Sequence, residues 1–358
     1  MSKKEVSKGN EALMEAAVRA GCRFYAGYPI TPQTTATEYL SWRMKEIGGQ
    51  FVQAESELAA INMVAGASMS GTRSLTATSG PGLSLMTETL SVMCGGRIPG
   101  VIVNIQRYGA GIGGIQGGQS DFYMVTKTFG HGGLTGLVYA PVSTQESVDL
   151  MVKAFDKSEE YRVPVVMLTD GSMGQMMEAV ALPDFIDPPD LSDQPYVAGT
   201  RNGRVKRAIF DTPWFGSSPN MADNVEQAYI AYEEMVQKWD ETEVMYEEYM
   251  MDDAQYVIFA WGTSARVAKT AVKTLREEGK KVGLFRPITL LPFPKSQIAA
   301  LSKNKIKAAL AVEMAVPAQF YYEVKLHLNN DIPLGSYKRS GGYMVLDEDI
   351  ADAMKKMM

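Results

Sequence analysis

Residues 74–82 have the sequence SLTATSGPG, in which a short β-prone run is followed at once by a turn. The run Ser74–Thr78 predicts a strand, and Ser79-Gly80-Pro81-Gly82 predicts the turn before the next helix. The sequence FYAGYPITP at residues 24–32 has the same form, because Pro29 terminates its strand. Short strands that alternate with helices in this way indicate a parallel sheet in an α/β protein.

Further helices and strands extend this alternation over the first 185 residues. One helix is predicted from Glu11 to Ala20, with Asn10 as its N-cap and Gly21 at its end. The run Glu57–Ser70, rich in Ala and Met, predicts another helix. Continuous apolar runs predict two buried strands, Pro99–Arg107 and Val163–Thr169.

The composition changes near Leu182, where Pro and Asp residues mark an irregular connector that reaches about Asn220. A polar helix rich in Glu and Tyr is predicted from Val225 to about Met250. A second α/β unit follows, with a helix that begins at Gly262-Thr263-Ser264 and strands at Tyr256–Ala260, Val282–Phe285, Ala308–Val312 and Gly342–Leu346. A chain of 358 residues is long enough for two such domains and a connector.

The composition excludes several classes of protein. The net charge of −6 leaves no basic stripe for nucleic acid. No apolar stretch approaches the roughly 20 residues needed to span a bilayer. The N-terminus has charges but lacks the apolar segment of a signal peptide. We therefore expect a cytoplasmic protein without nucleic-acid or membrane partners.

The cysteines and histidines also restrict the chemistry. Cys22 and Cys94 are far apart and form no CxxC motif, so both are predicted to be small buried side chains. This excludes a cysteine-ligated iron–sulfur cluster within this chain and disfavours zinc. The two histidines, His131 and His327, disfavour a triad hydrolase or a multi-histidine metal site. No metal site is predicted in this chain.

The turn YPITP at residues 28–32 is the first candidate site. It follows a predicted strand end, where ligands bind in open α/β sheets. Pro29 and Pro32 fix the backbone on both sides, so the Thr31 hydroxyl would be held in place. A rigid turn with no function is the alternative.

Two carboxylates, Glu55 and Glu57, stand at the start of the predicted helix 57–70. Helix capping alone would explain either, because negative groups are favourable at a helix N-terminus. Glu57, however, leads directly into the apolar run Leu58-Ala59-Ala60-Ile61. A carboxylate at the edge of a core could share or donate a proton.

Arg107 ends a predicted strand and precedes the glycine-rich run GAGIGG at residues 109–114. A guanidinium at a strand end, beside exposed backbone, could hold a carboxylate through two hydrogen bonds. A surface arginine in a salt bridge is the alternative.

Two further motifs are weak. Gly109, Gly111 and Gly114 satisfy GxGxxG, but the following residues are too rich in glycine to begin the helix that holds a pyrophosphate. The sequence TDGS at residues 169–172 is similar to the start of a thiamine diphosphate metal motif, but Thr169 replaces its first glycine and no paired asparagines follow. Turn chemistry at a strand end is the better interpretation of Asp170.

The order and spacing of these motifs resemble the pyrimidine-binding domain of 2-oxoacid:ferredoxin oxidoreductases. The matching motifs are AGYPITP (26–32), QAESELAA (53–60), TSGPG (78–82) and Arg107 before its glycine run. Farther on, LFRPITLLPFP (284–294) resembles the transketolase C-terminal-like domain of that family. The resemblance extends over nearly the whole chain.

The resemblance implies an α/β fold in three parts. Residues 1–185 would form a parallel-sheet domain that binds the pyrimidine of thiamine diphosphate. Residues 186–250 would form the connector and polar helix, and residues 251–358 the transketolase C-terminal-like α/β domain.

The resemblance also implies roles for the residues that match the motifs. Glu57 corresponds to the glutamate that hydrogen-bonds N1′ of the aminopyrimidine and favours its imino tautomer. Glu55 stays open as an alternative, because the SGPG region has one residue more than some relatives have. Thr31 and Arg107 correspond to residues that orient the 2-oxoacid, Arg107 through its carboxylate. The other positions implied to contact the cofactor are Tyr28, Pro29, Ile30, Ser79 and Gly80.

A divided active site follows from the resemblance, because this chain lacks a diphosphate–Mg²⁺ motif and cluster cysteines. A β-type subunit would share the thiamine diphosphate. Mg²⁺ and [4Fe-4S] clusters would lie on partner subunits, and γ- and δ-type ferredoxin-like subunits would pass electrons to ferredoxin. Coenzyme A would be the co-substrate, and this chain alone would be inactive.

The implied enzyme decarboxylates a 2-oxoacid oxidatively to an acyl-CoA, or catalyses the reverse reaction, as in anaerobic metabolism. Residues 111–132 resemble the 2-oxoisovalerate type more than the 2-oxoglutarate type, so 3-methyl-2-oxobutanoate is the expected substrate. The alternatives are 2-oxoglutarate, pyruvate, indolepyruvate or oxalate, a thiamine-dependent decarboxylase subunit, and a non-catalytic scaffold. The joint presence of Thr31, Glu57 and Arg107 counts against a scaffold.

Overall fold

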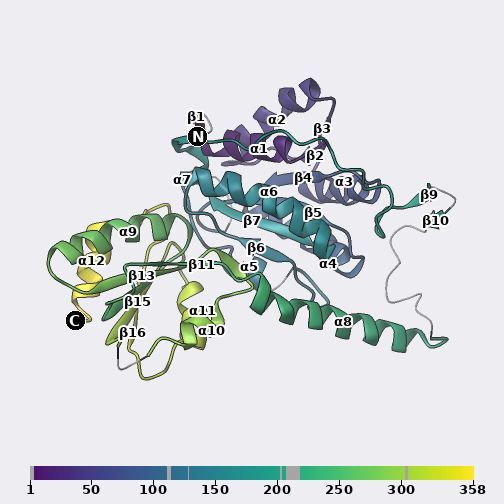
Figure 1. Ribbon diagram of the computed structural model, residues 1–358. Coiled ribbons are helices and arrows are strands. Elements are labelled where there is room, and N and C mark those ends of the chain that lie inside the picture. The colour runs from purple at the N-terminus through teal and green to yellow at the C-terminus, as the bar shows by residue number, and fades with distance from the viewer. Residues whose placement is uncertain (1–3, 111–113, 128, 202–203, 207–217, 303–304) are drawn as a thin grey trace.

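The computed structural model describes residues 4–358 apart from 111–113, 128, 202–203, 207–217 and 303–304. Two main sheets with helices around them make up the part that is described (Figure 1). The prediction of an α/β fold built on parallel sheets is confirmed. None of the helices in these ranges is long and apolar enough to cross a membrane.

The first sheet has seven strands in the order β14-β6-β7-β5-β4-β2-β3. Its strands are β2 (Phe24–Gly27), β3 (Gln50–Gln53), β4 (Ser74–Thr78), β5 (Gly100–Gln106), β6 (Leu137–Tyr139), β7 (Pro164–Asp170) and β14 (Thr289–Leu291). All neighbouring pairs are parallel except β14 and β6. The carboxyl ends of β2, β4, β5 and β7 therefore meet at one edge of the sheet.

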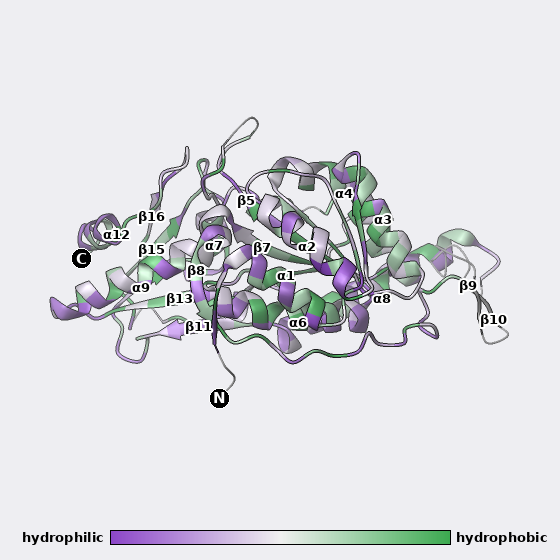
Figure 2. Ribbon diagram, turned by 90° about the horizontal axis from the view of Figure 1, so that it is seen from above, coloured by the Kyte–Doolittle hydropathy of each residue, from purple (hydrophilic) through white to green (hydrophobic). Residues whose placement is uncertain are grey.

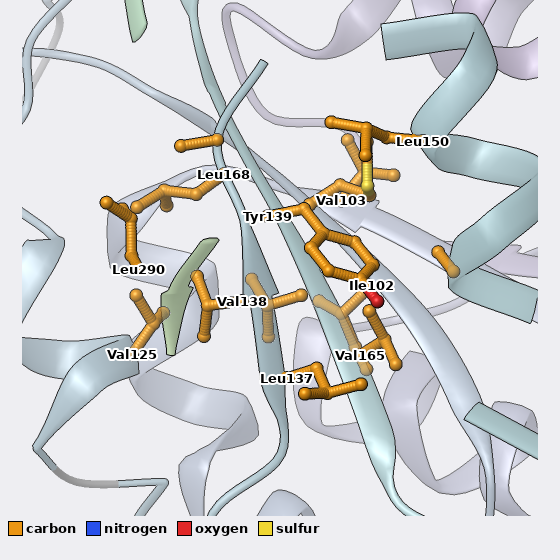
Figure 3. Close-up of a cluster of buried hydrophobic side chains, with 14 of the residues drawn as sticks. Ile102, Val103, Val125, Leu137, Val138, Tyr139, Leu150, Val165, Leu168 and Leu290 are labelled. Atoms are coloured by element: carbon orange, nitrogen blue, oxygen red, sulfur yellow. The ribbon is translucent and has the colours of Figure 1, made fainter. Parts of the chain in front are cut away.

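Helices cover this sheet and explain its apolar strands. They are α1 (Gly9–Arg19), α2 (Thr34–Glu46), α3 (Glu57–Met69), α4 (Gly80–Gly95) and α6 (Thr144–Tyr161), with the short α5 (Phe122–Thr126) and α7 (Gly171–Gln175). Helix α1 packs against α2 and α6, and α3 packs against α4. Strands covered on both faces become continuously apolar. Figure 3 shows the result, with Ile102, Val138 and Val165 in one fully buried cluster.

The second sheet has five strands in the order β11-β13-β12-β15-β16. They are β11 (Tyr246–Tyr249), β12 (Tyr256–Phe259), β13 (Val282–Pro287), β15 (Ala308–Glu313) and β16 (Leu334–Lys338). Only the pair of β11 and β13 is antiparallel. The helices after β11 are α9 (Gly262–Glu277), α10 (Lys295–Ala299), α11 (Phe320–His327) and α12 (Asp347–Lys355).

The remaining elements lie outside the two main sheets. Strands β1 (Glu5–Lys8) and β8 (Met177–Val180) pair with each other, as do β9 (Gly199–Arg201) and β10 (Arg204–Lys206). Helix α8 (Met221–Thr242) extends beyond both sheets (Figure 1) and packs its Trp239 edge-on against Tyr161 of α6.

A strand pair and a buried arginine are two of the contacts that join the sheets. Strand β14 comes from the C-terminal part of the chain but pairs with β6 of the first sheet. Arg286 of β13 is buried and donates two hydrogen bonds to Glu146 of α6, at 2.8 and 2.9 Å, and one to Glu247 of β11 at 2.7 Å. Bidentate charged bonds of this kind fix the relative position of the elements that carry them. The division of the chain at residues 185 and 250 stays a prediction.

Several predicted elements were wrong at their ends. Helix α1 begins at Gly9, so Asn10 lies inside it and Lys8 holds the N-cap position. Residues 80–82 are the first turn of α4 rather than a separate turn. Pro81 is tolerated there, because the first N–H groups of a helix have no intrahelical acceptor.

Two predictions in the second unit were also wrong. The polar helix ends at Thr242, and the alternating sequence YEEY at 246–249 forms the edge strand β11. Residues 342–346 form no strand, because Gly341 and Gly342 have φ of 68° and 84°, in the left-handed region. The strand in this region is β16, which precedes them.

Candidate functional site

The candidate site lies where the carboxyl ends of β2, β4 and β5 meet. The turn 28–32 follows β2, Ser79 follows β4, and Arg107 follows β5. Parallel pairing places these ends side by side. Glu57, at the start of α3, lies against the first turn of α4, which begins at the end of β4.

The structure brings Thr31 and Arg107 together from positions 76 residues apart. Nη1 of Arg107 donates to the carbonyl oxygen of Thr31 at 3.0 Å and approaches its hydroxyl oxygen at 3.5 Å. The Arg107 side chain is 9% exposed, which does not fit a surface arginine. Thr31 is exposed, so its hydroxyl is accessible beside a largely buried cation.

The turn 28–32 is held by side chains outside it. Gln33 Nε2 donates to the carbonyl oxygen of Tyr28 at 2.9 Å, and Asn10 Nδ2 donates to that of Pro32 at 3.1 Å. The prediction that Asn10 caps α1 is therefore wrong. Asn10 lies inside that helix, and its side chain supports the turn 28–32. Pro29 is exposed and Ile30 half-buried, so the turn is open to solvent on one side.

Glu57 is the first residue of α3, and its side chain is 5% exposed. The N-cap is Ser56, whose Oγ accepts from the Ala59 N–H at 3.1 Å, so Glu57 is not needed as a cap. Within the described parts of the chain, no hydrogen-bond or ion-pair partner contacts the Glu57 carboxylate. Glu55, two residues earlier, is exposed.

Glu57 packs against the first turn of α4 at Gly82. A Cβ at Gly82 would lie 2.5 Å from both Cγ and Oε1 of Glu57. Only glycine allows the carboxylate to come this close to the helix backbone. The position is also close to the positive end of the α4 dipole, which favours a negative group.

Ser79 and Gly80 begin α4 at the end of β4. The Ser79 side chain is fully buried, and its Oγ has no hydrogen-bond partner among the residues that are described. A buried hydroxyl without a partner is costly, so a polar group or water bound here would stabilise it. A Cβ at Gly80 would lie 2.8 Å from both carboxylate oxygens of Asp121.

Three polar residues of this region were missed by the sequence predictions. Asn104 and Gln106 are fully buried in β5, and Asp121 is 8% exposed at the start of α5. Asn104 Nδ2 donates to Asp121 Oδ2 at 2.9 Å, and the Asp121 N–H donates to Gln106 Oε1 at 3.1 Å. The signal was present in the strand sequence GVIVNIQ, where two amides interrupt an otherwise apolar buried strand.

The two weak motifs, TDGS and GxGxxG, do not form cofactor sites among the described residues. Asp170 caps α7 by accepting from the Ser172 N–H at 2.8 Å, and Thr263 of α9 also donates to it. Burial raises the pKa of Asp170. Gly111 of the GxGxxG pattern lies outside the described residues, and Gly109 and Gly114 do not belong to a helix.

Cys22 and Cys94 are buried, as predicted. Burial raises the pKa of each thiol to about 12, so both are protonated at neutral pH. Among the described residues, no group of three or more His, Cys, Asp and Glu side chains is arranged to hold a metal ion.

The family models cover the two parts of the chain in turn. Residues 15–250 match the thiamine diphosphate-binding domain of pyruvate flavodoxin/ferredoxin oxidoreductase. The chain belongs to this family. Residues 254–350 match core domain II of pyruvate:ferredoxin oxidoreductase. The resemblance inferred from the sequence motifs, and with it an oxidoreductase subunit, is confirmed.

Curated members of the family are similar over nearly the full length. The ketoisovalerate oxidoreductase subunit VorB of Methanothermobacter thermautotrophicus is 40% identical over 99% of this chain and 97% of its own. The 2-oxoglutarate synthase subunit KorA of Methanocaldococcus jannaschii is 34% identical over 90% of this chain and 91% of its own.

Solved structures share the fold. The 2-oxoglutarate:ferredoxin oxidoreductase of Magnetococcus marinus, with 2-oxoglutarate, coenzyme A and succinyl-CoA bound, superposes with a TM-score of 0.84 at 25% identity. The match covers 99% of this chain and 65% of that one. A split-gene transketolase, 14% identical, shares the fold with a TM-score of 0.58 over 100% of this chain and 98% of its own.

Proposed function

We propose that this chain supplies the pyrimidine side of a thiamine diphosphate site and the oxoacid anchor of a 2-oxoacid:ferredoxin oxidoreductase. The observation that carries the proposal is the buried carboxylate of Glu57 beside the first turn of α4, which has no partner among the residues that the structure describes. A hydrogen-bond donor on a bound molecule would stabilise a carboxylate in this state. The fully buried Ser79 Oγ, which has no partner among the described residues, supports a polar ligand at the same place.

Thiamine diphosphate fits these residues. Glu57 would accept a hydrogen bond from the aminopyrimidine, and Ser79, Gly80 and the backbone of residues 28–30 would surround that ring. When bound, the cofactor supplies the carbanion and electron-sink chemistry that 2-oxoacid decarboxylation requires. The share of this chain is to hold a proton at Glu57 and to orient the reactants. The burial of Glu57 and the exposure of Glu55 support Glu57 for this role.

Arg107 and Thr31 would bind the oxoacid. A guanidinium that is largely buried gives a stronger charge-assisted bond to a carboxylate than an exposed one does. The contact of Arg107 with the Thr31 backbone fixes the guanidinium next to the Thr31 hydroxyl. The two groups can then orient the carboxylate and the adjacent carbonyl of the same substrate.

Partner subunits would complete the site. Exposed apolar side chains flank Glu57 on α3 and α4, where Leu58 is 44% and Leu85 is 53% exposed. Figure 2 shows these two helices as predominantly hydrophobic. A β-type subunit that covers them would bring the diphosphate, Mg²⁺ and a [4Fe-4S] cluster, and γ- and δ-type subunits would pass electrons to ferredoxin. Since coenzyme A and ferredoxin react in the cytoplasm, we place the complex there.

The proposed substrate is 3-methyl-2-oxobutanoate. It is supported by the 40% identity to a ketoisovalerate oxidoreductase subunit, against 34% to a 2-oxoglutarate synthase subunit. The test is to assay the complex with co-expressed partner subunits on a panel of 2-oxoacids. We expect the highest kcat/KM with 3-methyl-2-oxobutanoate, followed by other branched-chain oxoacids. A higher kcat/KM with 2-oxoglutarate would assign the chain to the other type.

A further inference from the structure

The second unit of the chain holds residues 119–123, a short turn that leads into α5, at both ends. Gln119 Nε2 donates to the carbonyl oxygen of Trp261 at 2.8 Å, and its Oε1 accepts from Ser264 Oγ at 2.5 Å and from the Met314 N–H at 2.9 Å. All four residues are buried. The first residue of the turn is thereby fixed to β12–α9 and to the end of β15.

Gln319 fixes the rest of the turn. Its Nε2 donates to the carbonyl oxygen of Ser120 at 2.7 Å, and its Oε1 accepts from the Tyr123 N–H at 2.8 Å. Gln319 is itself held by Glu313, whose Oε2 accepts from the Gln319 N–H at 2.8 Å. The residue between these contacts, Asp121, cannot move without breaking a buried polar network.

Asp121 faces the candidate site from this rigid support. Its Oδ2 accepts from Asn104, and both carboxylate oxygens lie against Gly80 at the start of α4. Asn104 and Arg107 belong to the same strand end, and Gly80 follows Ser79 directly. The first turn of α4 therefore lies between two carboxylates, with Glu57 against Gly82 and Asp121 against Gly80.

The charge of Asp121 depends on pH near neutrality. Burial raises its pKa to about 6, against the lowering effects of the Asn104 hydrogen bond and the Arg107 charge. The neighbouring elements carry further charged groups, among them Arg107 after β5, Glu57 on α3, Asp170 on β7 and Glu313 on β15. Arg107 is the one whose charge stabilises the ionised Asp121. The reverse must also hold, so ionised Asp121 offsets part of the positive field of Arg107.

We propose that Asp121 is a positioning residue whose charge sets how strongly Arg107 binds the carboxylate of the oxoacid. The inference rests on the proposed role of Arg107. When Asp121 is protonated, it no longer offsets the charge with which Arg107 attracts the substrate. When Asp121 is ionised, it attracts the guanidinium and repels the substrate carboxylate, so binding weakens.

The sign of the pH dependence follows from the raised pKa of Asp121. Its protonated form predominates below about pH 6 and is lost as the pH rises through that value. The oxoacid carboxylate stays ionised over this range. In the reconstituted complex, we therefore expect KM for the oxoacid to rise on the order of tenfold between pH 5 and 8, while kcat follows its own profile.

The variant Asp121→Asn tests this inference. Asparagine has almost the same shape and can still accept from Asn104, but it carries no charge. KM should be low and independent of pH across the same range, with kcat retained. The matched control is Glu243→Gln, which removes another buried carboxylate that faces Lys157 at 2.7 Å. The control should keep the native pH profile of KM.

A second variant covers the case in which Asp121→Asn does not assemble. Asn104→Ala removes the donor that stabilises ionised Asp121, so the rise of KM should move to higher pH. An unchanged rise in Asn104→Ala, or a native pH profile in Asp121→Asn, would overturn the inference. The variant Arg107→Met distinguishes a failure of this inference from a failure of the proposed function. If Arg107→Met keeps the native KM, the oxoacid anchor itself is wrong.

Discussion

Replacing Glu57 with glutamine should lower kcat of the reconstituted complex by roughly 10²- to 10⁴-fold, with little change in KM for the oxoacid. Glutamine has nearly the shape of glutamate, so the packing against Gly82 is preserved. What it loses is the charged acceptor that holds a proton against the pyrimidine. The expected loss therefore concerns the chemical step and not the assembly of the site.

The matched control is Glu55→Gln. Glu55 lies two residues from Glu57 and carries the same group, but it is exposed. The control should keep near-native kcat, measured as oxoacid-dependent viologen reduction. If Glu55→Gln instead loses activity and Glu57→Gln keeps it, the two carboxylates exchange roles. If both variants are fully active, this chain is a scaffold.

Replacing Arg107 with methionine should raise KM for the oxoacid about 10²- to 10³-fold. Methionine fills much of the same volume, so the loss is mainly that of a largely buried charge. The oxoacid carboxylate would then enter a site without its partner, which costs far more than the loss of an exposed ion pair. Thiamine diphosphate binding should be unaffected, since Arg107 is assigned to the substrate.

Steady-state kinetics with varied oxoacid and saturating coenzyme A would measure this effect. Arg276→Met is the control, because Arg276 of α9 pairs at 2.6 Å with Asp253, which lies in the turn before β12 and away from the candidate site. Unchanged KM in Arg107→Met, with the control also native, would show that another group binds the carboxylate.

Much of the fold was predictable because local sequence and tertiary packing agree. The continuous apolar run Val163–Thr169 predicted a buried strand, and β7 at Pro164–Asp170 is buried throughout, as expected. The candidate site followed from the same pattern. Thr31 and Arg107 stand at strand ends, and parallel pairing brings such ends together.

The remaining features depend on contacts that no local pattern encodes. Asn10 reads as a helix cap, but its side chain bonds to the carbonyl oxygen of Pro32, 22 residues away. Residues 246–249 were predicted as the end of a polar helix, but they form a strand because they pair with the edge of β13. Asp121 lies in a glycine-rich segment without periodicity, and hydrogen bonds from β5 and from the second unit give it a fixed position. Long-range hydrogen bonds decide all three cases.

The central claim is that this chain holds half of an active site. The most direct test is oxoacid-dependent viologen reduction, measured on the purified chain with added thiamine diphosphate, Mg²⁺ and coenzyme A, and on the same chain co-expressed with its partner subunits. We predict no oxoacid-dependent reduction by the chain alone and clear reduction by the complex. Oxoacid-dependent turnover by the chain alone would contradict the divided site.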